Sequence, residues 1–366
     1  MKVLFVGNAQ GFLTIQLAKK LQLTYPELTI DILTDLSPEN RLPYREVYTY
    51  RTGKGIWKRN YFKSLHQFFA MRKALTDIPE GYDAVHILLV VPTYRLFWKQ
   101  LSSKGEKRIL TFFGSEYYRS NFLYRIFTKG MARTAQWVTA SNVQTLKDVC
   151  DHYEVAASKR RLCRFGLSIL EEIDLVSVQD LTSFNSQFGI SEATRCISVG
   201  YNAAPIQNHP LIIEQIAACK KVLPSFVLFF QFHGHRNAHV QQLIDACESN
   251  ELPYRIVDQL NDHELAVYRK RIDVCIQLQK TDQFSGAMQE HLYSGSRVIT
   301  GSWLPYQVLD EKDTDYCKIS SIDDLQRVLP QQIEMNSDKM KNSEIIRSLS
   351  SWEINIGSWF SLYERT

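Results

Sequence analysis

The chain has 366 residues, of which 45% are hydrophobic and 22% are charged, a composition that is ordinary for a soluble globular protein. This length favours two domains over one. No apolar stretch reaches the 18 residues of a membrane span, and the apolar run at residues 3–6 is too short for a signal peptide. We therefore expect a cytoplasmic protein that is neither secreted nor integral to a membrane.

Charge is distributed unevenly along the chain. Residues 1–165 hold 26 Lys and Arg against 13 Asp and Glu, a net charge of +13, whereas residues 166–366 hold 17 against 26, a net charge of −9. Such an asymmetry indicates that the first half faces an anionic partner.

The cysteines do not form a recognisable metal or disulfide pattern. There are seven, an odd number, and none lies in a C-x-x-C pair. The sequence therefore predicts reduced and mostly buried thiols, with no spacing that supports a zinc site.

Short apolar runs alternate with longer helical patterns in both halves. In the first half we expect strands at residues 3–6, 29–33, 84–89, 108–112, 137–140 and 161–165, with helices at 15–24, 62–75 and 142–152. In the second half we expect strands at 196–199, 226–232, 254–257, 274–278 and 297–300, with helices at 210–222, 237–249 and 262–271. This alternation predicts an α/β protein with two doubly wound parallel sheets.

The domain boundary should lie within residues 166–192, which interrupt the alternation and are polar and acidic. We expect one Rossmann-like domain at residues 1–170 and another at 190–345. The last segment, "SWEINIGSWFSLYERT", is rich in aromatic residues, and it favours a helix at about 350–366 that returns to the first domain. There is no internal repeat and no low-complexity tract.

Ligands of open parallel sheets bind beyond the carboxyl ends of the strands, so the loops there are the candidates for a site. After the first strand comes "GNAQGF", in which Gly7 and Gly11 allow close backbone approach before a helix N-terminus that attracts anions. The loop is not G-x-G-x-x-G, which argues against a nicotinamide cofactor. The alternative is a plain strand–helix turn.

After the fourth strand comes "TFFGSEYYR", which places Glu116 and Arg119 at a strand end. A carboxylate there is suited to accept a proton from a hydroxyl group. The alternative is helix capping, with Ser115 as the N-cap and Glu116 in the first turn.

Two loops of the second half carry polar groups. The first, "VGYNAAPIQNHP", contains Gly200 and Asn202, and the second, "FHGHRNAH", contains Arg236 among three histidines. His235 and His239 have the i, i+4 spacing of a metal pair, but phosphate contacts by His235 and Arg236 fit better, and a solvated loop is the further alternative.

The stretch with the most candidate site residues is "TDQFSGAMQEHLYSGSRVIT", residues 281–300, which follows a strand. A helix start at Ser285 and Gly286 offers backbone N–H groups to a phosphate. Glu290, one turn into that helix, is placed to accept hydrogen bonds from ribose hydroxyls. Asp282 and Lys280 lie in the preceding loop, where Asp282 either reaches a sugar hydroxyl or caps the helix.

The stretch "DQFSGAMQEHLYSGSRVIT" resembles the donor-site signature of the GT-B glycosyltransferases, particularly glycosyltransferase family 4: an acidic residue, seven residues, then Glu on a helix, followed by Gly and an apolar strand. The resemblance implies the GT-B fold, with Asp282 contacting the donor sugar and Glu290 the nucleotide ribose. "TFFGSE" and "VGYN" stand where family members have acceptor-side and donor-side loops.

The chain departs from the family pattern at two places. Family members usually carry Arg and Lys after the first strand of the second domain, for the diphosphate, where this chain has Asn202. Many also carry His before the Gly that here is Gly114, and this chain has Phe113. The candidates left for the diphosphate are His235, Arg236 and Lys280.

The resemblance implies a hexosyltransferase-like enzyme that moves a sugar from a nucleotide-sugar to a glycan or a lipid-linked acceptor, without a metal or another cofactor. Bacterial surface polysaccharide, such as capsule or O-antigen, and glycolipid are the expected products. Glu116 is the candidate acceptor-side base and Asp282 acts at the donor sugar. Two alternatives remain: a GT-B-like protein that only binds its partner, and a GT-B sugar-nucleotide epimerase.

Residues 51–75 carry seven Lys and Arg and no acidic residue, with aromatic side chains between them. This pattern is typical of a surface that meets anionic lipid headgroups. Nucleic acid is a poorer partner because no RNA- or DNA-binding motif accompanies the segment, and a solvated helix with one core face is the other alternative. We expect peripheral contact with the inner face of the cell membrane.

Overall fold

The computed structural model describes residues 1–35, 38, 41–50, 60–232, 238–282 and 284–364, and the side chains of residues 60–66 are not described. The chain divides into two compact units, which are treated one at a time. The first unit comprises residues 1–166 and 352–366, and the second comprises residues 167–351. Within the described residues, no helix combines the length and the apolar character needed to cross a bilayer.

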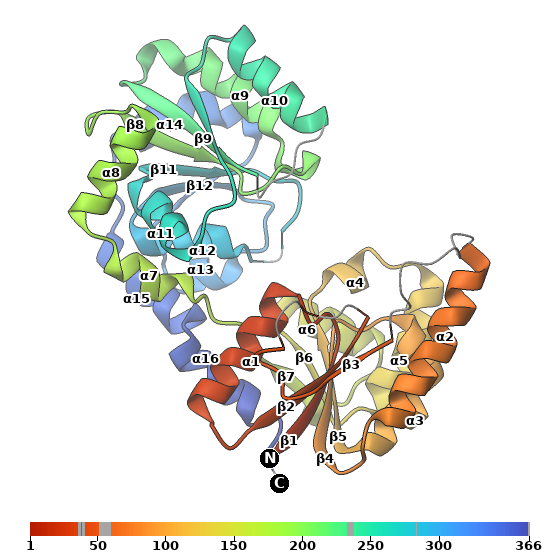
Figure 1. The fold of residues 1–366 in the computed structure, drawn as a ribbon. Helices are drawn as coiled ribbons and strands as arrows, with labels where there is room; N and C mark the ends of the chain where they lie inside the picture. Colours follow the sequence, from red (N-terminus) through yellow and green to blue (C-terminus); the bar gives the residue numbers. More distant parts are fainter. Residues whose placement is uncertain (36–37, 39–40, 51–59, 233–237, 283, 365–366) are drawn as a thin grey trace. The chain divides into compact units, whose positions relative to one another are not determined.

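The first unit is built on a seven-stranded parallel sheet of order β3-β2-β1-β4-β5-β6-β7 (Figure 1). Its strands are β1 (Lys2–Val6), β2 (Thr29–Thr34), β3 (Val47–Thr49), β4 (Tyr82–Leu88), β5 (Gly105–Phe112), β6 (Trp137–Ala140) and β7 (Arg160–Leu162). Its helices before the crossover are α1 (Phe12–Thr24), α2 (Asn60–Asp77), α3 (Trp98–Lys104), α4 (Ser115–Tyr118), α5 (Phe122–Thr134) and α6 (Val143–His152). The central strands are buried along their length because helices cover both faces of the sheet.

The C-terminal helix α16 (Trp352–Phe360) packs in the first unit. The ring of Phe360 stacks on Tyr25, the C-cap residue of α1, with 3.6 Å between the ring centroids. The indole N–H of Trp359 donates to the carbonyl oxygen of Arg164 at 2.8 Å. Gly166 is required next to this helix, since a Cβ there would lie 2.4 Å from the Trp352 ring. The helix predicted to cross back to the first domain is therefore present.

A histidine in the core of the first unit makes its stability sensitive to acid. His86 on β4 is fully buried, between the Tyr363 hydroxyl at 2.8 Å and the Thr111 hydroxyl at 2.7 Å, and burial lowers its pKa to about 3. Below pH 6.5 the unfolded chain binds a proton here that the folded chain does not, so we expect stability to fall as the pH drops from 6.5 towards 3. The expected slope is about 1.4 kcal/mol per pH unit for this histidine.

Urea unfolding of the first unit at several pH values measures this slope. His86→Gln keeps a hydrogen-bonding side chain but cannot titrate, so we expect a shallower slope, whereas the exposed His152→Gln serves as a control and should leave it unchanged. Equal slopes for His86→Gln and the parent protein would show that the burial of His86 does not govern the acid response.

The second unit is built on a six-stranded parallel sheet of order β10-β9-β8-β11-β12-β13 (Figure 1). Its strands are β8 (Arg195–Val199), β9 (Phe226–Gln231), β10 (Tyr254–Val257), β11 (Val274–Gln277), β12 (Arg297–Gly301) and β13 (Cys317–Ile319). Its α-helices are α7 (Ile169–Leu175), α8 (Val178–Phe188), α9 (His209–Cys219), α10 (Ala238–Ser249), α11 (Asp262–Arg271), α12 (Gly286–Ser294), α13 (Gln307–Glu311), α14 (Leu325–Gln332) and α15 (Lys339–Ser350). Separate apolar cores lie on the two faces of the sheet.

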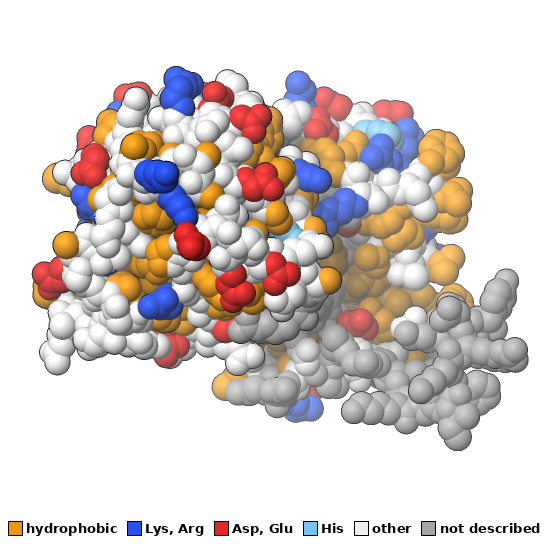
Figure 2. Space-filling view, turned by 90° about the horizontal axis from the view of Figure 1, so that it is seen from above, with side chains coloured by type: hydrophobic (Ala, Val, Ile, Leu, Met, Phe, Trp, Pro, Cys, Tyr) orange, Lys and Arg blue, Asp and Glu red, His pale blue; other side chains and the backbone are white. Residues whose placement is uncertain are grey.

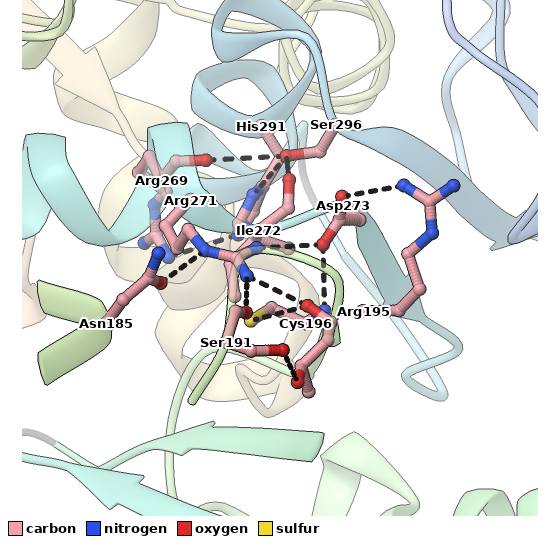
Figure 3. A network of polar contacts seen from close by, with 11 residues as sticks. Asn185, Ser191, Arg195, Cys196, Arg269, Arg271, Ile272, Asp273, His291 and Ser296 are labelled. Atoms are coloured by element: carbon pink, nitrogen blue, oxygen red, sulfur yellow. Dashed lines mark hydrogen bonds and ion pairs between the residues drawn. The ribbon is translucent and has the colours of Figure 1, made fainter. Parts of the chain in front are cut away.

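A polar network ties α8 to the amino ends of this sheet (Figure 3). Arg271 donates to the side-chain oxygen of Asn185 at 2.7 Å, to Asp273 at 3.0 Å and to the carbonyl oxygen of Thr194 at 2.8 Å. Asp273 also accepts from the backbone N–H of Cys196 at 2.8 Å. Apart from Gly166, residues 166–192, which interrupt the sequence pattern, thus belong to the second unit and contain α7 and α8.

Every strand that the sequence predicts is present, with ends shifted by a few residues at most. The sequence analysis missed β3 and β13, because three residues are too few to establish an alternating pattern. Six of the seven cysteines are buried, which confirms the prediction of mostly buried thiols.

Candidate functional site

Glu290 lies on α12, close to the carboxyl edge of the second sheet, and forms a nearly buried ion pair. One carboxylate oxygen accepts from Nε of Arg269 on α11 at 2.8 Å, and the two side chains are 12% and 3% exposed. The other oxygen, Oε1, lies close to Gly286, since a Cβ added to Gly286 would be 3.7 Å from Oε1. The structure thus leaves one oxygen of Glu290 facing the start of its own helix.

Arg269 is held by three groups, and none of these contacts is evident from the sequence. Besides Glu290, it donates to the side-chain oxygen of Gln231 at 3.0 Å and to Nε2 of His291 at 3.2 Å. Burial and the adjacent guanidinium lower the pKa of His291 well below its usual value, so the ring is neutral and accepts through Nε2. Nδ1 then donates to Ser296 at 3.0 Å (Figure 3).

Asp282 lies in the loop between β11 and α12, and one of its oxygens, Oδ2, is surrounded by donors. The Ser285 backbone N–H and the Gln279 amide each donate to it at 3.0 Å, and the Tyr306 hydroxyl donates as well. Burial, together with the Asp282 charge, raises the pKa of Tyr306 well above its usual value, so its hydroxyl remains a donor. These contacts fix the orientation of the carboxylate.

The helix start lies where the sequence analysis placed it. Ser285 is the N-cap of α12, and its hydroxyl oxygen accepts from the Met288 N–H at 3.3 Å. The helix begins at Gly286, so Glu290 lies in its second turn. Lys280 is exposed beyond the end of β11, and its backbone N–H donates to Ile206.

The loop after β8 also lies at the carboxyl edge of the second sheet. Gly200 has a φ of +65°, and a Cβ there would lie 2.6 Å from Nε2 of His209, so this position requires glycine. Asn202 accepts from the N–H of Ala204 at 2.9 Å and thereby shapes the turn. Gln207 was missed by the sequence analysis: its amide is buried and lacks a hydrogen-bond partner within the described part of the chain.

Two histidines of the second unit, His209 and His239, lie side by side. Nδ1 of His209 lies 3.0 Å from Nε2 of His239, and burial, followed by the His239 charge, lowers the pKa of His209 to about 3. Among the described residues, no group of three His, Cys, Asp or Glu side chains is placed to hold a metal ion. His235 and Arg236 lie outside the described residues, as do residues 51–59 of the basic segment.

In the first unit, the two predicted glycines have structural reasons to be glycine. A Cβ on Gly7 would lie 2.6 Å from the carbonyl oxygen of Leu88 on β4. Gly11 is the N-cap residue of α1, and a Cβ there would lie 3.1 Å from the carbonyl oxygen of Asn8. The plain strand–helix turn therefore explains both positions without a ligand.

Glu116 lies in the first turn of α4, just beyond β5. Its Oε1 accepts from the backbone N–H of Phe113 at 2.6 Å, and burial raises its pKa although backbone hydrogen bonds oppose the shift. The N-cap is Gly114, with a φ of +102°, and not Ser115, because glycine alone adopts that backbone readily. Arg119 ends α4 and is exposed.

Comparison with known proteins gives one family and many structural relatives. Residues 2–142 match the family described as glycosyl transferase 4-like, and no curated protein matches. HepE of Anabaena, solved with UDP and glucose, is 14% identical, with a TM-score of 0.74 and 99% of both chains covered. A glycosyltransferase from Rickettsia africae is 12% identical, with a TM-score of 0.78, covering 99% of this chain and 97% of the other.

Sucrose-phosphate synthase from Thermosynechococcus elongatus is a third relative, 16% identical, with a TM-score of 0.73, covering 99% of this chain and 98% of that one. The match extends over both units of the chain in each case. The expected α/β fold, with two doubly wound parallel sheets and a C-terminal helix returning to the first, is confirmed as the GT-B fold.

Proposed function

We propose that this chain, which has the GT-B fold and resembles glycosyltransferase family 4, transfers a sugar from a nucleotide-sugar donor to a glycan or lipid-linked acceptor. The observation that carries the proposal is the group around α12: a helix N-terminus, an oriented Asp282, and a Glu290 with one oxygen free of the Arg269 ion pair. These three features suit the diphosphate, the transferred sugar and the ribose of a nucleotide-sugar.

In this proposal the bond between the sugar and the diphosphate breaks, and the acceptor oxygen forms a new bond to the sugar. Glu116 takes the proton that the acceptor hydroxyl loses, and Asp282 binds a hydroxyl of the donor sugar. The N–H groups at Ser285 and Gly286, together with Lys280, offset the charge of the departing diphosphate. His235, Arg236 and Asn202, and at the first unit's edge Gly7 and Gly11, remain proposed donor contacts.

The proposal also covers the acceptor, the transferred sugar and the nucleotide. We assign the enzyme to the cytoplasmic assembly of bacterial surface polysaccharide or glycolipid, with hexose as the transferred sugar. HepE has also been solved with UDP-glucose and with UDP, and UDP is therefore the first nucleotide to test. The basic and aromatic segment at residues 51–75 remains a proposed contact with anionic lipid.

A thermal-shift screen of nucleoside diphosphates tests the proposal. A nucleotide at about 100 times its Kd stabilises the folded chain by about 2.7 kcal/mol, so we expect the matching nucleotide to raise Tm by about 5–10 °C. Slow hydrolysis of the corresponding nucleotide-sugar would separate an enzyme from a protein that only binds, and an epimeric product would indicate the epimerase. No shift with any nucleoside diphosphate at millimolar concentration would overturn the proposal.

A further inference from the structure

A polar pocket, which we call the amino-end pocket, opens where β8, β11 and β12 begin, at the opposite edge of the second sheet from Asp282 and Glu290. It holds about 280 Å³, slightly less than the range of about 300–1,000 Å³ that is usual for small-molecule sites. The charged side chains of its wall are Arg195, Lys270, Arg271, Arg297 and Asp273. Four cations therefore share the wall with one carboxylate.

That carboxylate is divided between two of the cations. Asp273 accepts from Arg195 at 3.2 Å and from Arg271 at 3.0 Å (Figure 3). Glu334 also lies 3.9 Å from Arg195, but its side chain is 60% exposed, so water screens its charge. The two guanidinium groups are thus only partly neutralised by the protein.

Lys270 lacks a carboxylate partner. Its ammonium group donates to two carbonyl oxygens at the C-terminal end of α7, at 2.9 and 3.2 Å, and among the described residues it forms no ion pair. Lys339 is close to the same wall, since a Cβ added to Gly295 would lie 2.9 Å from its Cδ. Burial, followed by the charge of Lys339, lowers the pKa of Lys270, although Asp174 and Asp180 act in the opposite direction.

The charges of the pocket do not balance. Arg297 has a partner of its own in Asp315, at 2.5 Å and outside the wall. With Asp315, Glu334 and Asp273 all counted, the four cations of the wall still exceed the three carboxylates by one, and Lys339 adds another positive charge. Over the face that Figure 2 shows, by contrast, Lys and Arg are interspersed with Asp and Glu.

The donors of this wall suit a phosphate group. A guanidinium group presents its N–H donors in a planar fork that matches two phosphate oxygens, and an ammonium group adds a point charge. The uncharged polar residues of the wall include Ser294, Asn336 and Ser337, which suit the hydroxyl groups of a small polar molecule. The volume admits a phosphate group with a short polyol attached.

We propose that the amino-end pocket binds phosphate, either as inorganic phosphate or as the phosphate group of a small polar monoester. The anion lies among Arg195, Lys270 and Arg271 and supplies the negative charge that the wall lacks. This site is separate from the diphosphate contacts proposed at α12, because the strands are parallel and the two sites lie at their opposite ends. The inference does not depend on the proposed glycosyl transfer.

The two helices that hold the ion pair of Glu290 and Arg269 both end at this pocket. The last residues of α11 are Lys270 and Arg271, and the last residue of α12 is Ser294, whose hydroxyl donates to the carbonyl oxygen of Arg269 at 2.9 Å. Bound phosphate therefore links α11 to its neighbours, and we expect it to raise Tm by mass action.

Calorimetric titration of the full chain, in phosphate-free buffer of low ionic strength, tests the site. The probes are inorganic phosphate and glycerol 3-phosphate, with glycerol as the uncharged control. Asn336→Asp adds a negative charge to the wall at an exposed position, and Asn336→Ser is its neutral match. We expect the parent and Asn336→Ser to bind at least one phosphate probe but not glycerol, and Asn336→Asp to bind at least about tenfold more weakly because like charges repel.

A second variant removes a donor. Arg195→Gln takes away one guanidinium group but leaves Asp273 paired with Arg271. We expect it to weaken phosphate binding by about tenfold, since a hydrogen bond between charged groups is lost. The matched control is Arg327→Gln, a largely exposed arginine on α14 of the same unit, which should bind like the parent.

Three results would overturn the inference: no binding of either phosphate probe at millimolar concentration, equal affinity in Asn336→Asp and the parent, or equal affinity in Arg195→Gln and the parent. The nucleotide-induced rise in Tm reports the donor site separately and should be the same in all of these proteins. A chain that binds a nucleoside diphosphate but neither phosphate probe refutes the amino-end pocket alone, and the converse refutes the proposed function alone.

Discussion

Glu290→Gln is expected to weaken nucleoside diphosphate binding by about 10- to 100-fold while the protein remains folded. A carboxylate that accepts from ribose hydroxyls makes charge-assisted hydrogen bonds, each worth about 1.5–3 kcal/mol, and about 1.4 kcal/mol corresponds to a factor of ten in Kd. Glutamine loses the charge but keeps an oxygen that accepts from Nε of Arg269. Isothermal titration with the nucleotide identified by the thermal screen measures the change.

The choice of glutamine matters because of the ion pair. Alanine would leave the Arg269 guanidinium, 3% exposed, without its carboxylate, and removing one partner of a buried pair costs about 3–5 kcal/mol. A loss of binding by Glu290→Ala would then reflect damage to the fold. The control is Glu344→Gln, an exposed glutamate on α15 of the same unit, and unchanged affinity in Glu290→Gln would remove the ribose role from this residue.

The sequence identifies Glu290 and Asp282 but not the groups that hold them. Their spacing around Ser285 and Gly286 is local, and a strand, a turn and a helix start are enough to position them. Arg269 is 21 residues from Glu290 and belongs to another helix, so its role depends on how α11 packs beside α12. Tyr306, which orients Asp282, likewise comes from a distant segment. Such partners follow from tertiary packing, which local patterns do not encode.

The glycines show that a structural need can produce the same sequence signal as a functional one. The "GNAQGF" loop favours a ligand because glycine permits close approach, and Gly7 does have a close neighbour. That neighbour is the carbonyl oxygen of Leu88, from the adjacent strand β4. The sequence alone does not show whether glycine at this position makes room for a ligand or for a strand that lies about 80 residues further along the chain.

The exposed apolar face of α5 was missed for a related reason. At Phe122, Leu123, Ile126 and Phe127 the spacing matches the core face of an amphipathic helix, and apolar periodicity does not reveal which face is inside. The fold buries the opposite side, where the hydroxyl of Thr128 hydrogen-bonds to that of Tyr153 at 2.7 Å. Burial in the structure, and not the pattern, identifies the exposed face.

Glu116→Gln is expected to lower the rate of sugar transfer by about 10²- to 10⁴-fold, the usual contribution of a general base, with nucleotide affinity unchanged. Glutamine keeps an oxygen to accept from the Phe113 N–H, and the nucleotide site is proposed on the second unit. A rate assay with the donor found in the nucleotide screen, together with titration of the nucleotide, separates the two effects. Glu106→Gln, an exposed glutamate on β5, is the matched control.

The pH dependence of the parent gives an independent test of the same role. Burial raises the pKa of Glu116 above its ordinary value of 4.5, so the carboxylate that serves as base is lost at a higher pH than for an exposed glutamate. We expect the transfer rate to fall with decreasing pH as this group gains its proton, and we expect Glu116→Gln to lack that acidic limb. If the variant retained both the rate and the limb, Glu116 would serve only to cap the turn at Phe113, and the proton of the acceptor hydroxyl would have to leave through another group.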